Sequence, residues 1–210
     1  MLSHLRFFLN SMDHQTSKYL MLIRPRNFSS NEETLESNQF QNDFTESTNL
    51  SQIRERVDIE FINMVDRLSD HEIDHIVFDD IEHLGSPDAI FPNNWITFHD
   101  DGTVVLYPMM SSKRRKERRN DIIEKLSLQG FAVIKTIDLS YLENNGHYLE
   151  GTGSMILDRH SKKAYACISS RTTKEALTSF SDSMSYEIIE FSSTTNIPIY
   201  HTNVMMSLGE

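Results

Sequence analysis

The order of the predicted secondary-structure elements repeats along the chain, and this repetition restricts the fold more than any other feature. Two strand-like segments joined by the turn Asp100-Asp101-Gly102 are followed by a basic helical segment and a third strand. The same order recurs around the turn at 158–161. Two successive ββαβ units of about forty residues each predict an α/β fold assembled from repeated supersecondary modules. The predicted elements are 95–99, 103–109, 114–129 and 131–137 in the first unit, and 154–157, 163–168, 172–180 and 187–191 in the second.

Strand and helix patterns also lie on both sides of the repeat. Residues 19–24 are typical of a strand, the apolar positions from 53 to 68 step by four and three as in an amphipathic helix, and 75–78 predicts a short buried strand. After the second unit, the apolar run 197–206 predicts a strand that would open a third unit. An edge this apolar would be an aggregation liability in a complete protein. We therefore expect an incomplete set of modules; the alternative is an ordinary α/β sandwich that ends on an edge strand.

Composition narrows the class of protein. The 210 residues suffice for one domain or two small ones, and the net charge of −11 argues against a general nucleic-acid or membrane-surface binder. A single cysteine excludes an internal disulfide framework and favours a reducing compartment, and no apolar run approaches the roughly 20 residues that span a bilayer. We expect a cytoplasmic protein that binds neither nucleic acid nor membrane. Residues 1–18 are expected to form a disordered N-terminal extension, with a cleaved targeting peptide as the alternative, and 19–210 to form the folded part.

Two polar stretches stand out in the first ββαβ unit. FPNNW at 91–95 places two carboxamides directly before a strand. KRRKERR at 113–119 packs six cations into seven positions, which suits either a solvated helix face or a clamp for a carboxylate or phosphate. Nucleic-acid binding by this run is the weaker alternative, because it lacks interleaved aromatic residues.

Two further stretches surround the second unit. YLEGTGS at 148–154 puts Glu150 beside two glycines, where the backbone can approach a ligand closely. HTN at 201–203 places His201 and Asn203 two residues apart, and therefore on one face of the predicted strand. Each motif is weak alone, because a lone strand histidine is more often a packed core residue than a catalyst.

Together these motifs resemble one superfamily. The order FPNNW, PM-x4-RR-x-E, LEGTG, AYAC-x3-RT, HTNV is similar to that of the guanidine-modifying enzymes, which include arginine deiminases, dimethylargininases and amidinotransferases. IRPRNF at 23–28 and the later NQFQ resemble the opening of its arginine-deiminase-related branch, which contains citrulline-utilisation hydrolases. The resemblance implies a five-bladed α/β propeller of ββαβ modules. This chain would be an incomplete propeller, the N-terminal portion of a catalytic domain lacking its C-terminal blades.

The resemblance also implies roles for individual residues. Enzymes of this superfamily attack the central carbon of a guanidino or ureido group with a cysteine thiolate, without metal or cofactor. His201 matches the general acid and base, and Glu150 matches the glutamate that binds substrate and supports the histidine. Arg114 and Arg171 match two arginines that grip an amino-acid carboxylate, for which a bidentate guanidinium suits better than lysine.

Departures from the superfamily pattern bear on the substrate. Asn94 and Asn203 stand where deiminases have aspartates that pair with guanidinium, and Gly153 stands where their glutamate motif ends in aspartate. A cationic guanidinium would lose two charge-assisted hydrogen bonds, each worth about 1.5–3 kcal/mol, whereas a neutral ureido group would lose much less. We therefore expect a citrulline-like substrate hydrolysed toward ornithine, with an arginine derivative as the alternative. A catalytically inactive relative that binds an amino acid or a partner protein remains the other class of function.

None of the motifs described so far supplies the cysteine nucleophile that the resemblance implies. Cys167 lies in AYAC, which matches the superfamily at a structural position, so we expect a buried packing residue there. The catalytic cysteine would then lie beyond residue 210, and the chain would be inactive alone. Because the incomplete ring leaves a sheet edge open, we also expect self-association through that edge.

Overall fold

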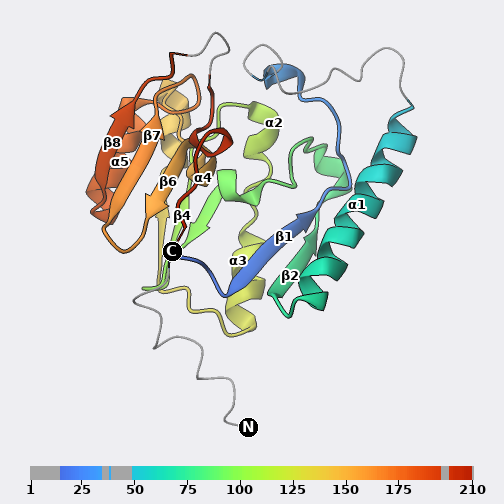
Figure 1. The fold of residues 1–210 in the computed structure, drawn as a ribbon. Helices are drawn as coiled ribbons and strands as arrows, with labels where there is room; N and C mark the ends of the chain where they lie inside the picture. Colours follow the sequence, from blue (N-terminus) through green and yellow to red (C-terminus); the bar gives the residue numbers. More distant parts are fainter. Residues whose placement is uncertain (1–14, 35–37, 39–48, 195–198, 210) are drawn as a thin grey trace. The chain divides into compact units, whose positions relative to one another are not determined.

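The computed structural model describes residues 15–34, 38, 49–194 and 199–209, which form two compact units (Figure 1). The first unit comprises Met1–Thr16, Asn93–Met110 and Arg118–Glu210, and the second comprises Ser17–Pro92 and Ser111–Glu117. The predicted extension at 1–18 lies outside the described residues up to position 14.

The first ββαβ module forms with the predicted order of elements. Strands β3 (Ile96–Phe98) and β4 (Thr103–Leu106) pair antiparallel, and β4 pairs in parallel with β5 (Lys135–Asp138) after a connection that contains helix α3 (Asn120–Leu128). Gly102 closes the β3–β4 turn with a φ of +76°, which a residue with a side chain rarely adopts.

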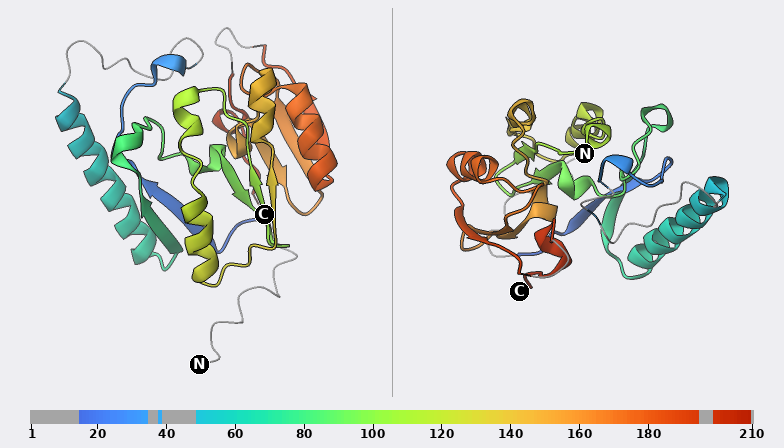
Figure 2. Two further views of the ribbon diagram at one scale, coloured as in Figure 1. Left: turned by 180° about the vertical axis from the view of Figure 1, so that it is seen from behind. Right: turned by 90° about the horizontal axis from the view of Figure 1, so that it is seen from above.

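The second module has the same topology. Strands β6 (Met155–Asp158) and β7 (Lys163–Cys167) form an antiparallel hairpin, and helix α5 (Lys174–Met184) leads to β8 (Glu187–Phe191), which pairs in parallel with β7. Helix α5 lies behind this sheet in Figure 1 and in front of it in the left view of Figure 2, which is seen from the opposite side. The predicted repeat is therefore confirmed at the level of strand order and direction.

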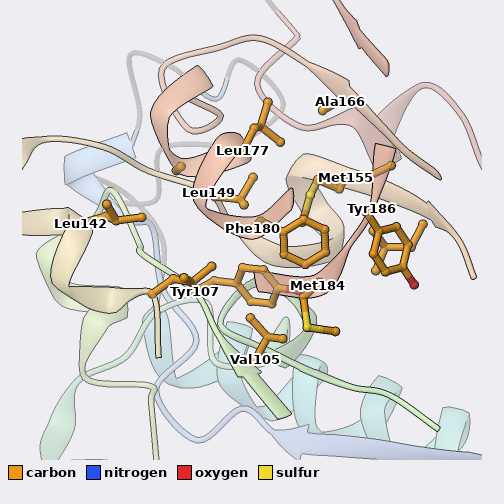
Figure 3. Packing of buried hydrophobic residues seen from close by; sticks show 14 residues of the cluster. Val105, Tyr107, Leu142, Leu149, Met155, Ala166, Leu177, Phe180, Met184 and Tyr186 are labelled. Atoms are coloured by element: carbon orange, nitrogen blue, oxygen red, sulfur yellow. The ribbon is translucent and has the colours of Figure 1, made fainter. Parts of the chain in front are cut away.

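A shared hydrophobic core joins the two modules of the first unit (Figure 3). The buried face of α5 carries Leu177 and Phe180, and the ring of Phe180 lies between those of Tyr107 and Tyr186, with centroid distances of 6.1 and 5.4 Å. Because these rings come from the residue after β4, from α5 and from the residue before β8, their burial fixes one module against the other.

The second unit is built on a parallel strand pair. Strand β1 (Tyr19–Arg24) pairs with β2 (Asp74–Asp79), and the long helix α1 (Leu50–Asp70) connects them and lies alongside them in Figure 1 and in the left view of Figure 2. The Asn49 side chain caps the first turn of α1. Arg24 donates two hydrogen bonds of 2.5 Å to Asp58, which ties the strand to the helix. The short helix α2 (Ser112–Arg115) also belongs to this unit.

Three predicted elements are wrong in detail. The single helix expected over 114–129 is two helices. The chain leaves the helical conformation between α2 and α3, where Arg119 has extended backbone at the N-cap position of α3. Residues 131–134 precede the strand β5 and do not belong to it. The strand expected over 197–206 is not formed by its described residues, which include the 3₁₀ turn η5 (Thr202–Val204).

All sheets of the described residues are open: one has two strands and two have three. Within the same residues, no helix combines the length and the apolar character needed to cross a membrane.

Candidate active site

Three segments that are distant in the sequence meet in the first unit. They are the end of the 3₁₀ turn η3 (Pro92–Asn94), the one-turn helix α4 (Gly151–Ser154) with its N-cap Glu150, and the stretch ending in His201, the N-cap of η5. The motifs FPNNW, LEGTG and HTNV supply these segments, so the structure brings together three of the five motifs that carry the resemblance.

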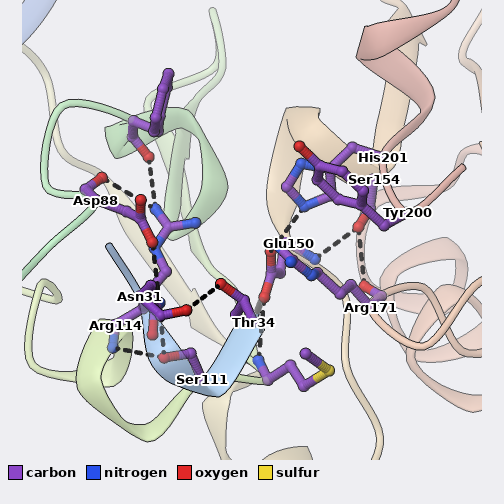
Figure 4. A network of polar contacts seen from close by, with 12 residues as sticks. Asn31, Thr34, Asp88, Ser111, Arg114, Glu150, Ser154, Arg171, Tyr200 and His201 are labelled. Atoms are coloured by element: carbon purple, nitrogen blue, oxygen red, sulfur yellow. Dashed lines mark hydrogen bonds and ion pairs between the residues drawn. The ribbon is translucent and has the colours of Figure 1, made fainter. Parts of the chain in front are cut away.

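The centre of the site is a buried histidine–carboxylate pair (right half of Figure 4). His201 Nε2 lies 2.7 Å from Glu150 Oε2, and the two side chains are 7% and 0% exposed. The backbone N–H of Met110 donates to the other oxygen, Oε1, at 3.2 Å. A carboxylate held in this way orients the imidazole and stabilises its protonated form, which is what a general acid and base requires.

Arg171 provides the second charge in this cluster. Its guanidinium Nη1 lies 3.6 Å from Glu150 Oε2, and its Cζ lies 4.3 Å from the ring centroid of Tyr200. The Tyr200 ring also lies 4.7 Å from the imidazole of His201. The buried carboxylate therefore already has a buried cation beside it, so with neutral His201 the cluster of these side chains has no net charge.

Two glycines allow the segments to approach one another. Gly151 has a φ of +45°, and a Cβ there would lie 2.2 Å from the Asn93 carbonyl oxygen. A Cβ on Gly153 would lie 2.5 Å from Asn94 Nδ2 and 2.9 Å from both Cε1 and Nδ1 of His201. The Asn94 amide and the His201 ring consequently share the space that a side chain at 153 would fill.

Buried hydroxyls that the sequence reasoning missed hold the segments in place. Ser154 Oγ accepts from the Glu150 N–H at 2.9 Å and donates to the Arg171 carbonyl at 2.9 Å. Thr202 Oγ1 accepts from the Cys167 N–H at 2.8 Å and donates to the Ser154 carbonyl at 2.6 Å. Both residues lie inside motifs already singled out, EGTGS and HTN, but nothing in their spacing distinguishes a structural hydroxyl from a solvent-exposed one.

Asn203 does not join this cluster. It is exposed, whereas His201 is buried, because the 3₁₀ turn replaces the strand that would have put both on one face. The prediction that the two side chains share a face is therefore wrong, and the part of Asn203 in substrate binding stays a prediction.

Arg114 belongs to the second unit (left half of Figure 4). Its side chain is 2% exposed, and it donates to Glu117 through Nε at 3.1 Å and Nη2 at 2.9 Å. Nη2 also lies within 3.4 Å of the carbonyl oxygens of Asp88 and Phe91. A ligand carboxylate would have to compete with Glu117 for this guanidinium. The contacts with Glu117, Asp88 and Phe91 hold the surrounding chain together, and the binding of a substrate carboxylate by Arg114 stays a prediction.

Cys167 is fully buried on β7. Its thiol lies 3.9 Å from the carbonyl oxygen of the next residue, Ile168, which is a local contact typical of a packing cysteine. Among the described residues, no group of three or more His, Cys, Asp or Glu side chains is arranged to hold a metal ion.

Comparisons with known proteins identify the family and the fold. A family model described as N,N-dimethylarginine dimethylhydrolase, eukaryotic, matches residues 24–210. The fold is similar to that of the N-terminal domain of ArgZ, an arginine dihydrolase from cyanobacteria, solved as a cysteine-to-serine mutant bound to substrate (TM-score 0.63, 16% identity, 87% of this chain and 60% of that one). It is also similar to dimethylarginine dimethylaminohydrolase in an adduct with S-methyl-L-thiocitrulline (TM-score 0.60, 12% identity, 88% of this chain and 64% of that one). A third similar structure is the enzyme from Pseudomonas aeruginosa complexed with citrulline (TM-score 0.56, 13% identity, 86% of this chain and 63% of that one). No curated protein matches the chain significantly.

The mixed α/β fold and the family match place the chain in the guanidine-modifying superfamily, which confirms the resemblance seen in the sequence. More narrowly, the chain belongs to the N,N-dimethylarginine dimethylhydrolase family. It spans less than two thirds of the length of the three solved structures.

Proposed function

We propose that the chain is the N-terminal portion of a hydrolase that acts on the ureido or guanidino carbon of a free amino acid, with citrulline favoured and an arginine-type substrate next. The observation that carries the proposal is the buried His201–Glu150 pair, with the Asn94 amide next to the imidazole across Gly153. The nucleophilic cysteine would lie beyond residue 210. In the intact enzyme His201 would protonate the nitrogen that leaves after thiolate attack, and would then take a proton from the hydrolytic water.

The charge of the cluster favours a neutral substrate. Arg171 lies 3.6 Å from Glu150 and offsets its charge, and Asn94 is an amide at 3% exposure. A guanidinium entering here would find no uncompensated carboxylate among these side chains, and burying an unpaired cation is costly. A ureido group needs only hydrogen bonds, which Asn94 can both donate and accept.

The substrate preference is tested with Asn94→Asp. Because we propose that the 210-residue chain lacks the nucleophile, calorimetric titration with L-citrulline and L-arginine would measure binding without turnover. We expect the natural chain to prefer citrulline, and Asn94→Asp to shift the ratio of the two affinities toward arginine by about tenfold, the value of one charge-assisted hydrogen bond at the low end. Asn120→Asp, at the exposed start of α3, is the matched control and should leave the ratio unchanged.

A substrate screen of a full-length homologue tests the reaction itself. Faster turnover of arginine than of citrulline would refute the citrulline preference, and binding of neither amino acid by the 210-residue chain would count against the proposed site.

The incomplete five-bladed propeller is the fold that accompanies this proposal. Strands β1 and β2 with α1 repeat the last three elements of a ββαβ module, but among the described residues β1 has no antiparallel partner of the kind that β3 gives β4 and β6 gives β7. An unpaired edge of this kind would promote self-association. Sedimentation of the purified chain tests this, and a compact monomer at high concentration would contradict it.

The second candidate is a non-catalytic relative that binds an amino acid or a partner protein. It is favoured by Cys167, the single cysteine of the sequence, being buried in β7. The coding sequence beyond residue 210 separates the two: an open frame that encodes a cysteine supports the hydrolase, and unrelated sequence supports the binding protein.

A further inference from the structure

We propose that Tyr200 is a positioning residue that holds the Arg171 guanidinium beside Glu150 and thereby sets the electrostatic environment of His201. Its catalytic meaning rests on the proposed function, whereas its test does not. The half-buried ring of Tyr200 contacts both the guanidinium and the imidazole of the cluster: Arg171 Cζ is 4.3 Å from its centroid, and the His201 ring is 4.7 Å away at an interplanar angle of 51°.

The backbone around Tyr200 is held in a way that fits this role. Ser169 Oγ donates to the Tyr200 carbonyl oxygen at 2.8 Å, and the same hydroxyl accepts from the Arg171 N–H at 3.1 Å. One serine hydroxyl therefore links the backbones of the ring and of the guanidinium that stacks on it. Tyr200 and Arg171 are therefore held together twice, by the stacking of their side chains and by the Ser169 hydroxyl between their backbones.

The position of Arg171 matters because it and His201 approach the same atom. Glu150 Oε2 lies 2.7 Å from His201 Nε2 and 3.6 Å from Arg171 Nη1. Glu150 favours protonation of the imidazole, and a cation held this close to the shared oxygen opposes it. The Tyr200 ring, which is neutral, also contacts the imidazole, and Gly153 separates the imidazole from the neutral Asn94 amide. Because it shares this oxygen with the imidazole, Arg171 limits how strongly Glu150 can raise the basicity of His201.

Removing the ring should release Arg171 toward water and strengthen the hold of Glu150 on a protonated imidazole. A flat aromatic ring attracts a guanidinium over its face, which an aliphatic side chain of similar volume does not do. The hydroxyl of Tyr200 is not needed for this attraction, so phenylalanine should substitute for tyrosine.

The experiment is an NMR titration of histidine ring signals in the 210-residue chain, with the His201 signal assigned by its loss in His201→Gln. Tyr200→Leu and Tyr200→Met should each move the His201 titration midpoint upward by about one pH unit, the low end of the effect of one nearby charge, whereas Tyr200→Phe should leave it in place. Arg171→Met should produce the same upward movement, and combining it with Tyr200→Leu should add nothing further, because both changes remove one interaction.

The proposal is wrong if Arg171→Met moves the midpoint and neither aliphatic variant at 200 does, or if the two effects add fully. Two aliphatic variants keep the test decisive where one of them fails to fold, which circular dichroism would show. Failure here would leave the ligand preferences measured for Asn94 unaffected, and loss of ligand binding would leave this titration unaffected, so the two proposals can fail separately.

Discussion

Replacement of His99 should remove most of the pH dependence of stability between pH 6.5 and 5. His99 ends the β3 strand region with 8% exposure. Its Nε2 lies 3.0 Å from Thr97 Oγ1, and its Nδ1 accepts from Arg159 Nη1 at 3.4 Å. Burial, followed by the positive charges of Arg159 and Lys162, lowers the pKa of His99 from 6.5 to about 3. A proton on Nδ1 would face a guanidinium, so the folded protein keeps this ring neutral.

The magnitude follows from the two pKa values. An unfolded chain protonates His99 below pH 6.5, whereas the folded chain does so only near pH 3, so the unfolded state binds more protons in between. The contribution of His99 to stability is therefore complete above pH 6.5 and is lost as the pH falls toward about 3. At pH 5 the loss amounts to about 2 kcal/mol. Carboxylates with lowered pKa values, such as Glu33 at about 2, lose their contribution only at lower pH.

The assay is urea unfolding followed by fluorescence of Trp95, the single tryptophan, which is 1% exposed and lies in the same module. We expect the natural chain to lose about 2 kcal/mol between pH 7 and 5, and His99→Gln to lose less than half of that, after any pH-independent cost of the substitution. His160→Gln, at an exposed histidine of the β6–β7 turn, is the control and should follow the natural chain. Equal losses in His99→Gln and the natural chain would show that His99 does not resist protonation in the fold.

Two further predictions concern the site. Thr202→Val should destabilise the chain by about 2–4 kcal/mol in urea unfolding, because it leaves a buried N–H and a buried carbonyl unpaired, whereas Thr202→Ser should recover most of this; equal stability of the two variants would show that the hydroxyl is dispensable. Gly153→Ala should lower citrulline affinity at least tenfold while costing about 1–3 kcal/mol of stability, because its Cβ would overlap Asn94 and His201; unchanged affinity in a titration would contradict the close packing of these two side chains.

The sequence predicted the repeated modules because their signals are local. Alternating apolar residues around a glycine turn specify a hairpin, and helix periodicity specifies the crossover, so the order of both ββαβ units could be derived before any coordinates. The basic run was predicted less well. One interpretation of its cations was a solvated helix face, and the other was a clamp for a carboxylate or phosphate. In the structure Arg118 pairs with Glu143 and Arg119 pairs with Asp121, and these ion pairs accompany the break between α2 and α3. A periodicity argument does not identify the charge partner of Arg118, which lies 25 residues further along the chain.

The C-terminal part shows the same limit more sharply. Its apolar composition favours a strand at His201, yet Thr202 places its hydroxyl between two buried backbone groups and the chain turns there. Tertiary hydrogen bonds of this kind outweigh strand propensity, which depends strongly on context. The change has a consequence for the site: a strand would have presented Asn203 beside His201, whereas the turn exposes Asn203 and leaves Asn94 as the amide next to the imidazole.

The proposed preference for citrulline over arginine consequently depends on the Asn94 amide and on Gly153. In a site with an aspartate at 94, the carboxylates would outnumber Arg171, and a guanidinium could supply the missing positive charge. With Asn94 the buried charges of Glu150 and Arg171 already balance, so an added cation would raise the cost of burial instead of lowering it. Gly153 reinforces this, because an acidic side chain there would overlap the Asn94 amide and the His201 ring in the present arrangement. A charge introduced at 94 should therefore change ligand preference with little rearrangement, whereas one introduced at 153 should first displace the imidazole from Glu150, and comparison of the two variants would separate an electrostatic origin of the preference from a steric one.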